Sequence, residues 1–198
     1  MQYQNDHWAG KAALNDLTQL LVRIVDLRDP NAERHSEGVA ELSAELARRI
    51  NMDVDEREVL QHAAILHDVG KVAISDSVIN KPSRLTRAEY LMVQQHTVLG
   101  HKLLQPMKIN AVITAAILSH HENYDGSGYP EGLKGEAIPL AARLIRIADF
   151  YDALTSHRSY RNKVAYGSAD ALDILQENRH CFDPFLFDTF VEMIVEKS

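Results

Sequence analysis

Two pairs of adjacent residues in this sequence carry side chains that commonly bind metal ions. His67 and Asp68 end one apolar segment, and His120 and His121 end another. A fifth candidate, Asp149, lies within a strongly apolar segment, where a charged carboxylate is costly unless it is paired or binds a metal. Each of these residues alone is more often structural, but together they indicate a metal site.

The positions of the two pairs matter because of helix geometry. Adjacent residues on a helix point about 100° apart, since one turn takes about 3.6 residues. A His-Asp or His-His pair therefore does not chelate one ion from a regular helix. Such pairs work best where a helix ends or where two ions lie side by side, and both pairs here stand at the ends of expected helices.

Helical spacing of apolar residues predicts the elements that must position these side chains. Thr86 and Glu89 form a capping box that opens one helix, and Asp183 with Pro184 supplies an N-cap and a first-position proline for the last. No alternation of apolar and polar residues is long enough to indicate a sheet. We expect an all-α fold, a single domain of about seven or eight helices with the metals in a cleft between them. The expected helices cover residues 14–25, 39–50, 55–67, 86–104, 111–121, 140–154, 168–176 and 184–195.

One long irregular segment, residues 122–139, interrupts this helical pattern. Loops of this length are uncommon in compact domains and are often functional. The segment is rich in turn-forming residues, namely Gly126, Gly128, Pro130, Gly132, Gly135 and Pro139.

Composition limits the classes of function. The 198 residues suffice for one domain with a sizeable core. A net charge of −7 argues against binding a nucleic-acid polymer, although metals or a few cations could invert the charge locally for a small phosphate ligand. The single cysteine, Cys181, excludes an internal disulfide and a cysteine-based zinc site. With no apolar stretch long enough to enter a membrane, these features predict a cytoplasmic protein.

Several of these residues resemble the motifs of a known family. The run His67-Asp68-Val69-Gly70-Lys71 resembles the HDxGK element of the HD superfamily of metal-dependent phosphohydrolases, and the run from His120 to Pro130 resembles the HHE…DGxGYP block of its HD-GYP subfamily. The resemblance covers roughly residues 20–195. Further matches are Arg28-Asp29-Pro30 with His35-Ser36, Asn80-Lys81-Pro82, Gly132-Leu133-Lys134-Gly135, Ala148-Asp149 with Asp152-Ala153-Leu154-Thr155-Ser156, and Phe182-Asp183-Pro184.

The resemblance implies a set of metal ligands. One ion would be held by His35, His67, Asp68 and Asp149, and a second by His96, His120 and His121, with Asp68 bridging the two. Imidazoles and carboxylates without a thiolate suit first-row transition metals. The family favours two divalent ions of iron or manganese, while zinc, nickel and cobalt remain open. Two such ions about 3.5–4 Å apart can share a hydroxide, which would attack the phosphorus.

The resemblance also implies residues that handle the substrate. Lys71 would bind phosphate and stabilise the transition state, acting in catalysis together with His67 and Asp68. Arg158 and Arg161 would hold the substrate's phosphates or guanine edges. Tyr129 would contact the cyclic dinucleotide from the glycine-rich loop.

One ligand position departs from the family. Some members carry a glutamate four residues before the first histidine, where it helps to bind a third metal. Here that position is Asn31, a much weaker ligand. We therefore expect a centre of two metals and not three.

The leading interpretation is a cyclic di-GMP phosphodiesterase, a phosphoric diester hydrolase that yields linear pGpG and, after a second step, GMP. One alternative is a hydrolase of another cyclic dinucleotide such as cyclic GMP-AMP. Another is a catalytically silent module that binds cyclic di-GMP in signalling. Residues 1–20 would form a lead-in helix or the remnant of a preceding segment, and residues 21–198 the HD-GYP catalytic domain. The expected partners are a receiver or sensor domain, or a separate regulatory protein, and a homodimer stays open.

Overall fold

The architecture is all-α, as expected from the sequence. The computed structural model describes residues 2–29, 32–156 and 165–197, with the side chains of residues 2–11 and 33 left aside. Within these ranges the chain forms ten α-helices and no strand, with short 3-10 helices between some of them. The α-helices are α1 (Gln2–Asp26), α2 (Ala32–Arg49), α3 (Val54–Leu66), α4 (Asp76–Ile79), α5 (Arg87–Gln94), α6 (His96–Leu104), α7 (Ala111–Ser119), α8 (Leu140–Thr155), α9 (Ser168–Glu177) and α10 (Pro184–Val195). The 3-10 helices are η1 (Val69–Ala73), η2 (Gln105–Met107), η3 (Gly135–Ala137) and η5 (Arg179–Cys181).

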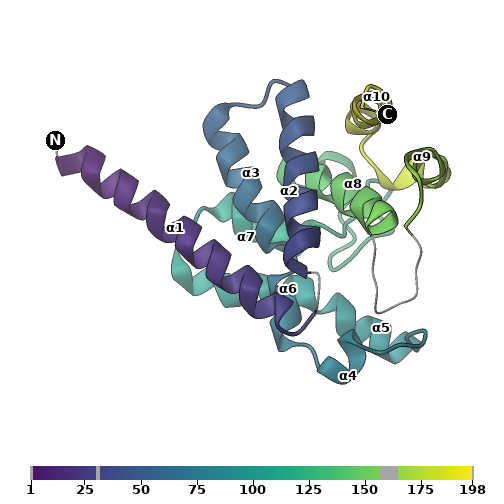
Figure 1. Cartoon of the computed structure of the whole chain (residues 1–198), viewed down its shortest axis with the longest axis horizontal. Helices are drawn as coiled ribbons and strands as arrows, with labels where there is room; N and C mark the ends of the chain where they lie inside the picture. Colours follow the sequence, from purple (N-terminus) through teal and green to yellow (C-terminus); the bar gives the residue numbers. More distant parts are fainter. Residues whose placement is uncertain (1, 30–31, 157–164, 198) are drawn as a thin grey trace.

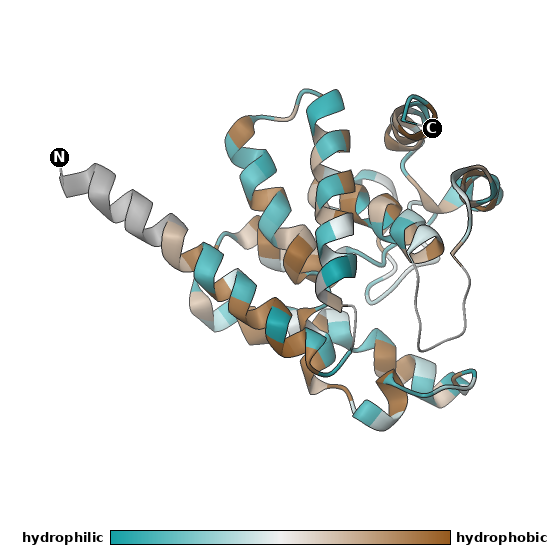
Figure 2. Cartoon of the chain, in the orientation of Figure 1, coloured by the Kyte–Doolittle hydropathy of each residue, from teal (hydrophilic) through white to brown (hydrophobic). Residues whose placement is uncertain are grey.

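The core lies where α2, α3, α7 and α8 meet. Helix α2 packs against both α3 and α8, while α7 packs against α3, α6 and α8. Figure 1 shows α2 and α3 side by side, with α8 next to α2 and α1 projecting away from the body. Hydrophilic and hydrophobic residues alternate around α2 and α3 in Figure 2, as expected of helices with one buried face. The fully buried Leu46, Leu60 and Ile145 come from three of these helices.

Two predicted helix starts are confirmed by their capping geometry. The Thr86 side chain accepts the Glu89 backbone N–H, while the Glu89 carboxylate accepts the Thr86 backbone N–H, which completes the capping box of α5. The Asp183 side chain accepts the N–H groups of Phe185 and Leu186 at the start of α10. Short-range capping signals were therefore sufficient to place both ends.

The expected single helix over residues 86–104 was wrong, because it is divided into α5 and α6. The division falls at Gln95, so that His96 begins α6. Helix α6 packs closely on η1, and a Cβ at Gly70 would lie 1.9 Å from the His96 carbonyl oxygen. Only glycine permits this approach, which brings the start of α6 next to the end of α3. This division and the short α4 also raise the helix count above the seven or eight expected.

Helix α1 packs one face against the core, while part of its apolar surface stays exposed. Val22 and Val25 are buried and Leu14 and Leu21 pack against the core, but Leu20 is 57% exposed. The expected division after residue 20 falls inside this continuous helix. None of the described helices is long and apolar enough to span a membrane.

Candidate metal centre

The seven predicted ligands converge on one site from five parts of the chain. Their donor atoms fall into three overlapping groups, in each of which all atoms lie within 4.8 Å of one another. The side chains come from α2, the end of α3, the start of α6, the end of α7 and the middle of α8. The groups are His35, His67 and Asp149; His67, Asp68 and His120; and His96, His120 and His121.

Three of the histidines are oriented in the same way by a backbone carbonyl of the preceding helical turn. The Nδ1 atoms of His67, His96 and His120 each donate to a backbone carbonyl three residues earlier, at 2.6, 2.7 and 2.8 Å. A neutral imidazole that donates through Nδ1 carries its free lone pair on Nε2. Such a bond also fixes the ring and is typical of metal-binding histidines. All three rings therefore present Nε2 to the centre as a lone-pair donor.

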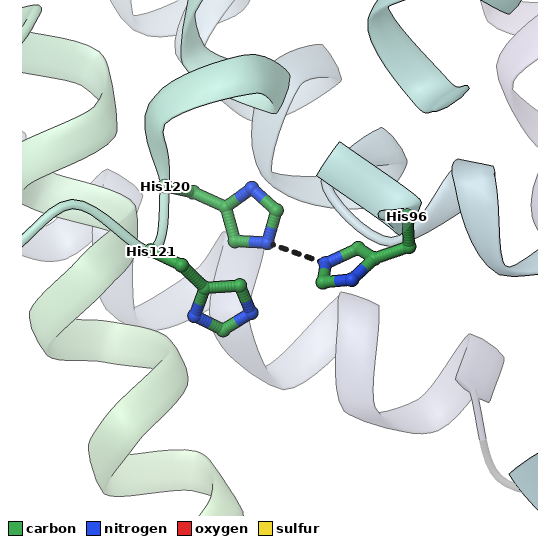
Figure 3. A group of neighbouring side chains, drawn as sticks. All are labelled: His96, His120 and His121. Atoms are coloured by element: carbon green, nitrogen blue, oxygen red, sulfur yellow. Dashed lines mark hydrogen bonds between the residues drawn. The ribbon is translucent and has the colours of Figure 1, made fainter. Parts of the chain in front are cut away.

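The contact between His96 and His120 tests whether a metal fits. Their Nε2 atoms lie 3.2 Å apart, the contact dashed in Figure 3. If both Nδ1 atoms carry the proton, the two Nε2 lone pairs oppose each other and neither can donate. A cation between them removes this conflict. With metal–nitrogen distances of about 2.1 Å, a separation of this size corresponds to an angle of about 100° at the metal, which ordinary coordination allows.

A second fit test comes from the group around His67. Its Nε2 atom is buried and makes no hydrogen bond within the described part of the chain. That atom lies 3.4 Å from Asp68 Oδ2 and 4.0 Å from Asp149 Oδ1. Buried polar atoms without a partner are rare in folded proteins, and a bound ion can supply the partner that such an atom needs. His35 completes this side of the centre, with its Nε2 atom 3.1 Å from Asp149 Oδ1.

Asp68 lies between the two sides of the centre. One carboxylate oxygen is 3.3 Å from His96 Nε2, and the other is 3.4 Å from His67 Nε2. This is the arrangement that a bridging ligand requires. Its assignment as the bridge stays a prediction, as do the metal-binding roles of the other six residues.

The electrostatics of the centre keep its two carboxylates ionised and favour the neutral form of His96, His120 and His121. Burial by itself raises the pKa of Asp68, but Lys71 and the neighbouring histidines outweigh burial and hold that pKa well below its usual value. Burial acts in the same direction on Asp149, whose pKa is nevertheless held low by its hydrogen bond with His35 and by His121. Burial lowers the pKa of His120 and His121 well below the ordinary value. These are the protonation states in which both residue types bind cations.

Lys71 contacts the centre through Asp68. Its Nζ atom lies 2.7 Å from Asp68 Oδ2 and donates to Asp29 Oδ2 at 3.1 Å. Asp29 is 4% exposed and the Lys71 side chain is 16% exposed, so the ion pair is largely shielded from water. This placement beside the predicted bridge suits the phosphate-binding role expected of Lys71, which stays a prediction.

The glycine-rich loop is anchored by Glu122. Its buried carboxylate accepts the backbone N–H groups of Glu131, Gly132 and Leu133, at 2.7, 3.1 and 3.1 Å. Gly128 packs against the chain that follows His121, and a Cβ there would lie 2.2 Å from the Asn123 nitrogen. These contacts bring Tyr129 to the metal centre, where its ring lies 4.8 Å from that of His121. Burial raises the pKa of the Tyr129 hydroxyl, so Tyr129 acts as a neutral group.

Three residues with clear positions in the site received no role from the sequence. Asp152 Oδ2 accepts from His35 Nδ1 at 2.5 Å and so turns His35 Nε2 toward the centre. Asp29 holds Lys71, and Glu122 holds the loop. Asp152 could have been found by its spacing, because it follows Asp149 by three residues and hence shares its helix face. Asp29 binds a side chain 42 residues away, and Glu122 binds backbone groups 9 to 11 residues away in an irregular loop, so helical spacing indicates neither partner.

Three further residues that the sequence singled out lie outside the described residues. These are Arg158 and Arg161, expected to bind substrate, and Asn31, expected to replace a ligand for a third metal.

Comparison with known proteins identifies the fold and the relatives of the chain. Residues 19–186 match the HD domain family. The chain is 38% identical over 173 residues to the cyclic di-GMP phosphodiesterase response regulator RpfG of Xanthomonas campestris, covering 86% of this chain and 46% of that protein. It is 33% identical over 184 residues to the 3′3′-cGAMP-specific phosphodiesterase 1 of Vibrio cholerae, covering 92% of this chain and 42% of that protein. The chain thus spans less than half the length of both relatives.

A solved structure supports the fold independently. Bd1817, described as an HDG"Y"P protein from Bdellovibrio bacteriovorus, superimposes with a TM-score of 0.69 at 18% identity, covering 93% of this chain and 62% of that one. At this level of identity the likeness concerns the fold alone.

Proposed function

Because the chain belongs to the HD domain family and carries the HD-GYP sequence blocks, we propose that it is a metal-dependent phosphodiesterase that hydrolyses cyclic di-GMP. The observation that carries this proposal is the convergence of five imidazoles and two carboxylates on one site, with the Asp68 carboxylate between its two sides. The HD family implies divalent metal ions, and the donor set fits them.

The proposed centre holds two ions of iron or manganese. His35, His67 and Asp149 bind on one side, His96, His120 and His121 on the other, and Asp68 bridges them. The choice of iron or manganese rests on the resemblance to the HD-GYP family. Imidazole and carboxylate donors without a thiolate are compatible with these metals, and equally with zinc, nickel or cobalt. When bound, the ions would supply activation of the attacking water and neutralisation of phosphate charge.

The protein's own groups orient the reaction. The pair formed by Asp29 and Asp68 holds the Lys71 ammonium at the edge of the centre, where it can donate to a non-bridging phosphate oxygen. The neutral Tyr129 hydroxyl can donate a hydrogen bond to the substrate from the loop side. Asp152 and the backbone carbonyls hold the imidazoles in place, so little reorganisation is needed during the reaction.

The choice of cyclic di-GMP rests on the relatives, several of which are named for this substrate. A second candidate is 3′3′-cGAMP, because other relatives of similar identity are named as specific for it. A cyclic dinucleotide substrate also agrees with a cytoplasmic location. Since both relatives compared above are about twice as long, we further propose that a receiver or sensor domain, or a partner protein, regulates this domain, with a homodimer as one form of that regulation.

The test is a hydrolysis assay with metal-loaded protein. The protein is reconstituted anaerobically with iron or manganese, its metal content is measured, and cyclic di-GMP and 3′3′-cGAMP are supplied separately. We expect conversion of cyclic di-GMP to the linear dinucleotide, at a higher kcat/KM than for 3′3′-cGAMP. His67→Ala and Asp68→Ala should both abolish turnover, with the greater loss of metal in Asp68→Ala because it removes the bridge. If wild-type protein contains two metals but hydrolyses neither cyclic di-GMP nor 3′3′-cGAMP, the proposed enzymatic activity is refuted.

A further inference from the structure

A hollow beside the metal centre is lined by several basic side chains, although the chain as a whole is acidic. It has a volume of about 770 Å³. This is within the range of small-molecule sites. It is formed by the segment between α4 and α5 together with α5 itself, and Figure 1 shows these two short helices next to each other, below α6. Its lining includes three cations, Lys81, Arg84 and Arg87, and the ring of Tyr90.

Internal hydrogen bonds hold the wall of this hollow in shape. Lys81 Nζ donates to both carboxylate oxygens of Glu89 at 2.7 Å, and the same carboxylate accepts from the backbone N–H and the hydroxyl of Thr86. The Glu89 carboxylate, the acid next to these cations, is therefore already hydrogen-bonded to Lys81 and Thr86. Arg84 and Arg87, by contrast, make no hydrogen bond or ion pair with any described residue. Two exposed guanidinium groups thus remain available on a preorganised wall.

The hollow is connected to the metal centre by one hydrogen bond and one electrostatic interaction. Val93, which lines it, accepts the hydrogen bond that orients His96 through its carbonyl oxygen. Tyr90 lies one turn earlier on the same face of α5, close enough to Tyr129 for their hydroxyls to interact electrostatically. Tyr129 in turn lies against His121. The hollow therefore lies next to the side of the metal centre that carries His96 and His121.

We infer that this hollow holds one guanine base of the cyclic dinucleotide, with Tyr90 stacked on the base and Arg84 and Arg87 donating to its O6 and N7 atoms. Aromatic side chains provide stacking surfaces for nucleic-acid bases. The arginine fork matches the two adjacent acceptors of guanine. Adenine presents an amino group at the corresponding position, where it would oppose a guanidinium donor. The inference rests on the proposed function and adds to it a site that selects guanine over adenine.

The experiment measures binding apart from turnover. The probes are the bis-phosphorothioate analogues of cyclic di-GMP and cyclic di-AMP, in which sulfur replaces a non-bridging oxygen of each phosphate to resist hydrolysis. Calorimetry gives the Kd of each for metal-loaded wild type and variants, and metal content is checked for each protein. We expect Tyr90→Ala to weaken binding of the cyclic di-GMP analogue by roughly 5- to 150-fold. Tyr90→Phe should bind as wild type does, because it keeps the ring.

The control for Tyr90 is its neighbour Leu91, which is 53% exposed against 50% for Tyr90 and does not line the hollow. Leu91→Ala should leave the Kd unchanged. An equal effect of Tyr90→Ala and Leu91→Ala, or none from either, would overturn the inference, while hydrolysis by wild type would leave the proposed function standing.

Arginine variants test whether the hollow distinguishes guanine from adenine. Arg87→Ala should reduce the preference for the guanine ring over the adenine ring by roughly 5- to 150-fold. Arg48→Ala, which removes the same charge from an exposed site at the end of α2, should leave that preference intact. Equal weakening of both rings by Arg87→Ala would mean that Arg87 meets phosphate, and would refute the guanine assignment. A wild type that binds the analogue but hydrolyses no ring would defeat the proposed activity alone.

Discussion

Replacing Asp152 by asparagine should release metal from one side of the centre without altering the other. The Asp152 side chain is 7% exposed, and its carboxylate accepts a hydrogen bond from His35 Nδ1 at 2.5 Å. Asparagine keeps the shape of this side chain but removes the negative charge of the acceptor. A hydrogen bond to a charged group contributes about 1.5–3 kcal/mol. Loss of such a partner behind a metal ligand typically costs about 10- to 100-fold in metal affinity or activity. We expect a loss of this size for the ion held by His35, His67 and Asp149.

The assay is metal retention during dialysis against a graded series of chelator concentrations, followed by elemental analysis. Wild type should keep two ions under conditions in which Asp152→Asn keeps one, because the other three histidines of the centre are not touched. The matched control is Asp183→Asn, another buried carboxylate, which caps α10 and pairs with Arg143. That change should lower the free energy of unfolding but leave metal content at two. Identical chelator curves for Asp152→Asn and wild type, with equal kcat, would refute the orienting role of Asp152.

Three further outcomes are expected. Lys71→Ala should retain both metals, because Lys71 is not a ligand. It should lower kcat more than it raises KM, because Lys71 acts on charge that develops in the transition state. An unchanged kcat in the fully metal-loaded variant would contradict this. The metal-free protein should keep its full stability above pH 6.5, the pKa of histidine in the unfolded chain, and should lose stability as the pH falls below that value. The reason is that His120 and His121 have lowered pKa values in the folded protein and therefore bind protons more readily when the chain is unfolded. An equal midpoint of thermal unfolding at pH 7.5 and pH 5.5 would be inconsistent with neutral buried imidazoles. Glu122→Gln should lower the free energy of unfolding by about 1–3 kcal/mol, because it weakens three backbone hydrogen bonds in the loop, and urea denaturation with no shift would argue against that anchor.

The sequence alone determined those features that depend on neighbours along the chain. Apolar periodicity placed most helices within a few residues, and the capping signals at Thr86 and Asp183 fixed two of their starts. The positions of His67 and His120 at helix ends followed from the same local patterns. With the resemblance to a family, the sequence also supplied all seven candidate ligands, which the fold brings together.

The tertiary structure decided what depends on contacts between distant segments. The division of residues 86–104 into α5 and α6 has no proline or glycine to announce it at Gln95, and it accompanies the packing of α6 on η1 at Gly70. The pairing of His35 with Asp152 joins residues 117 positions apart, and that of Lys71 with Asp29 joins residues 42 apart. Helical periodicity reports which face of a helix is buried but not which helix covers it, so the partners of each buried charge are fixed only when the helices pack.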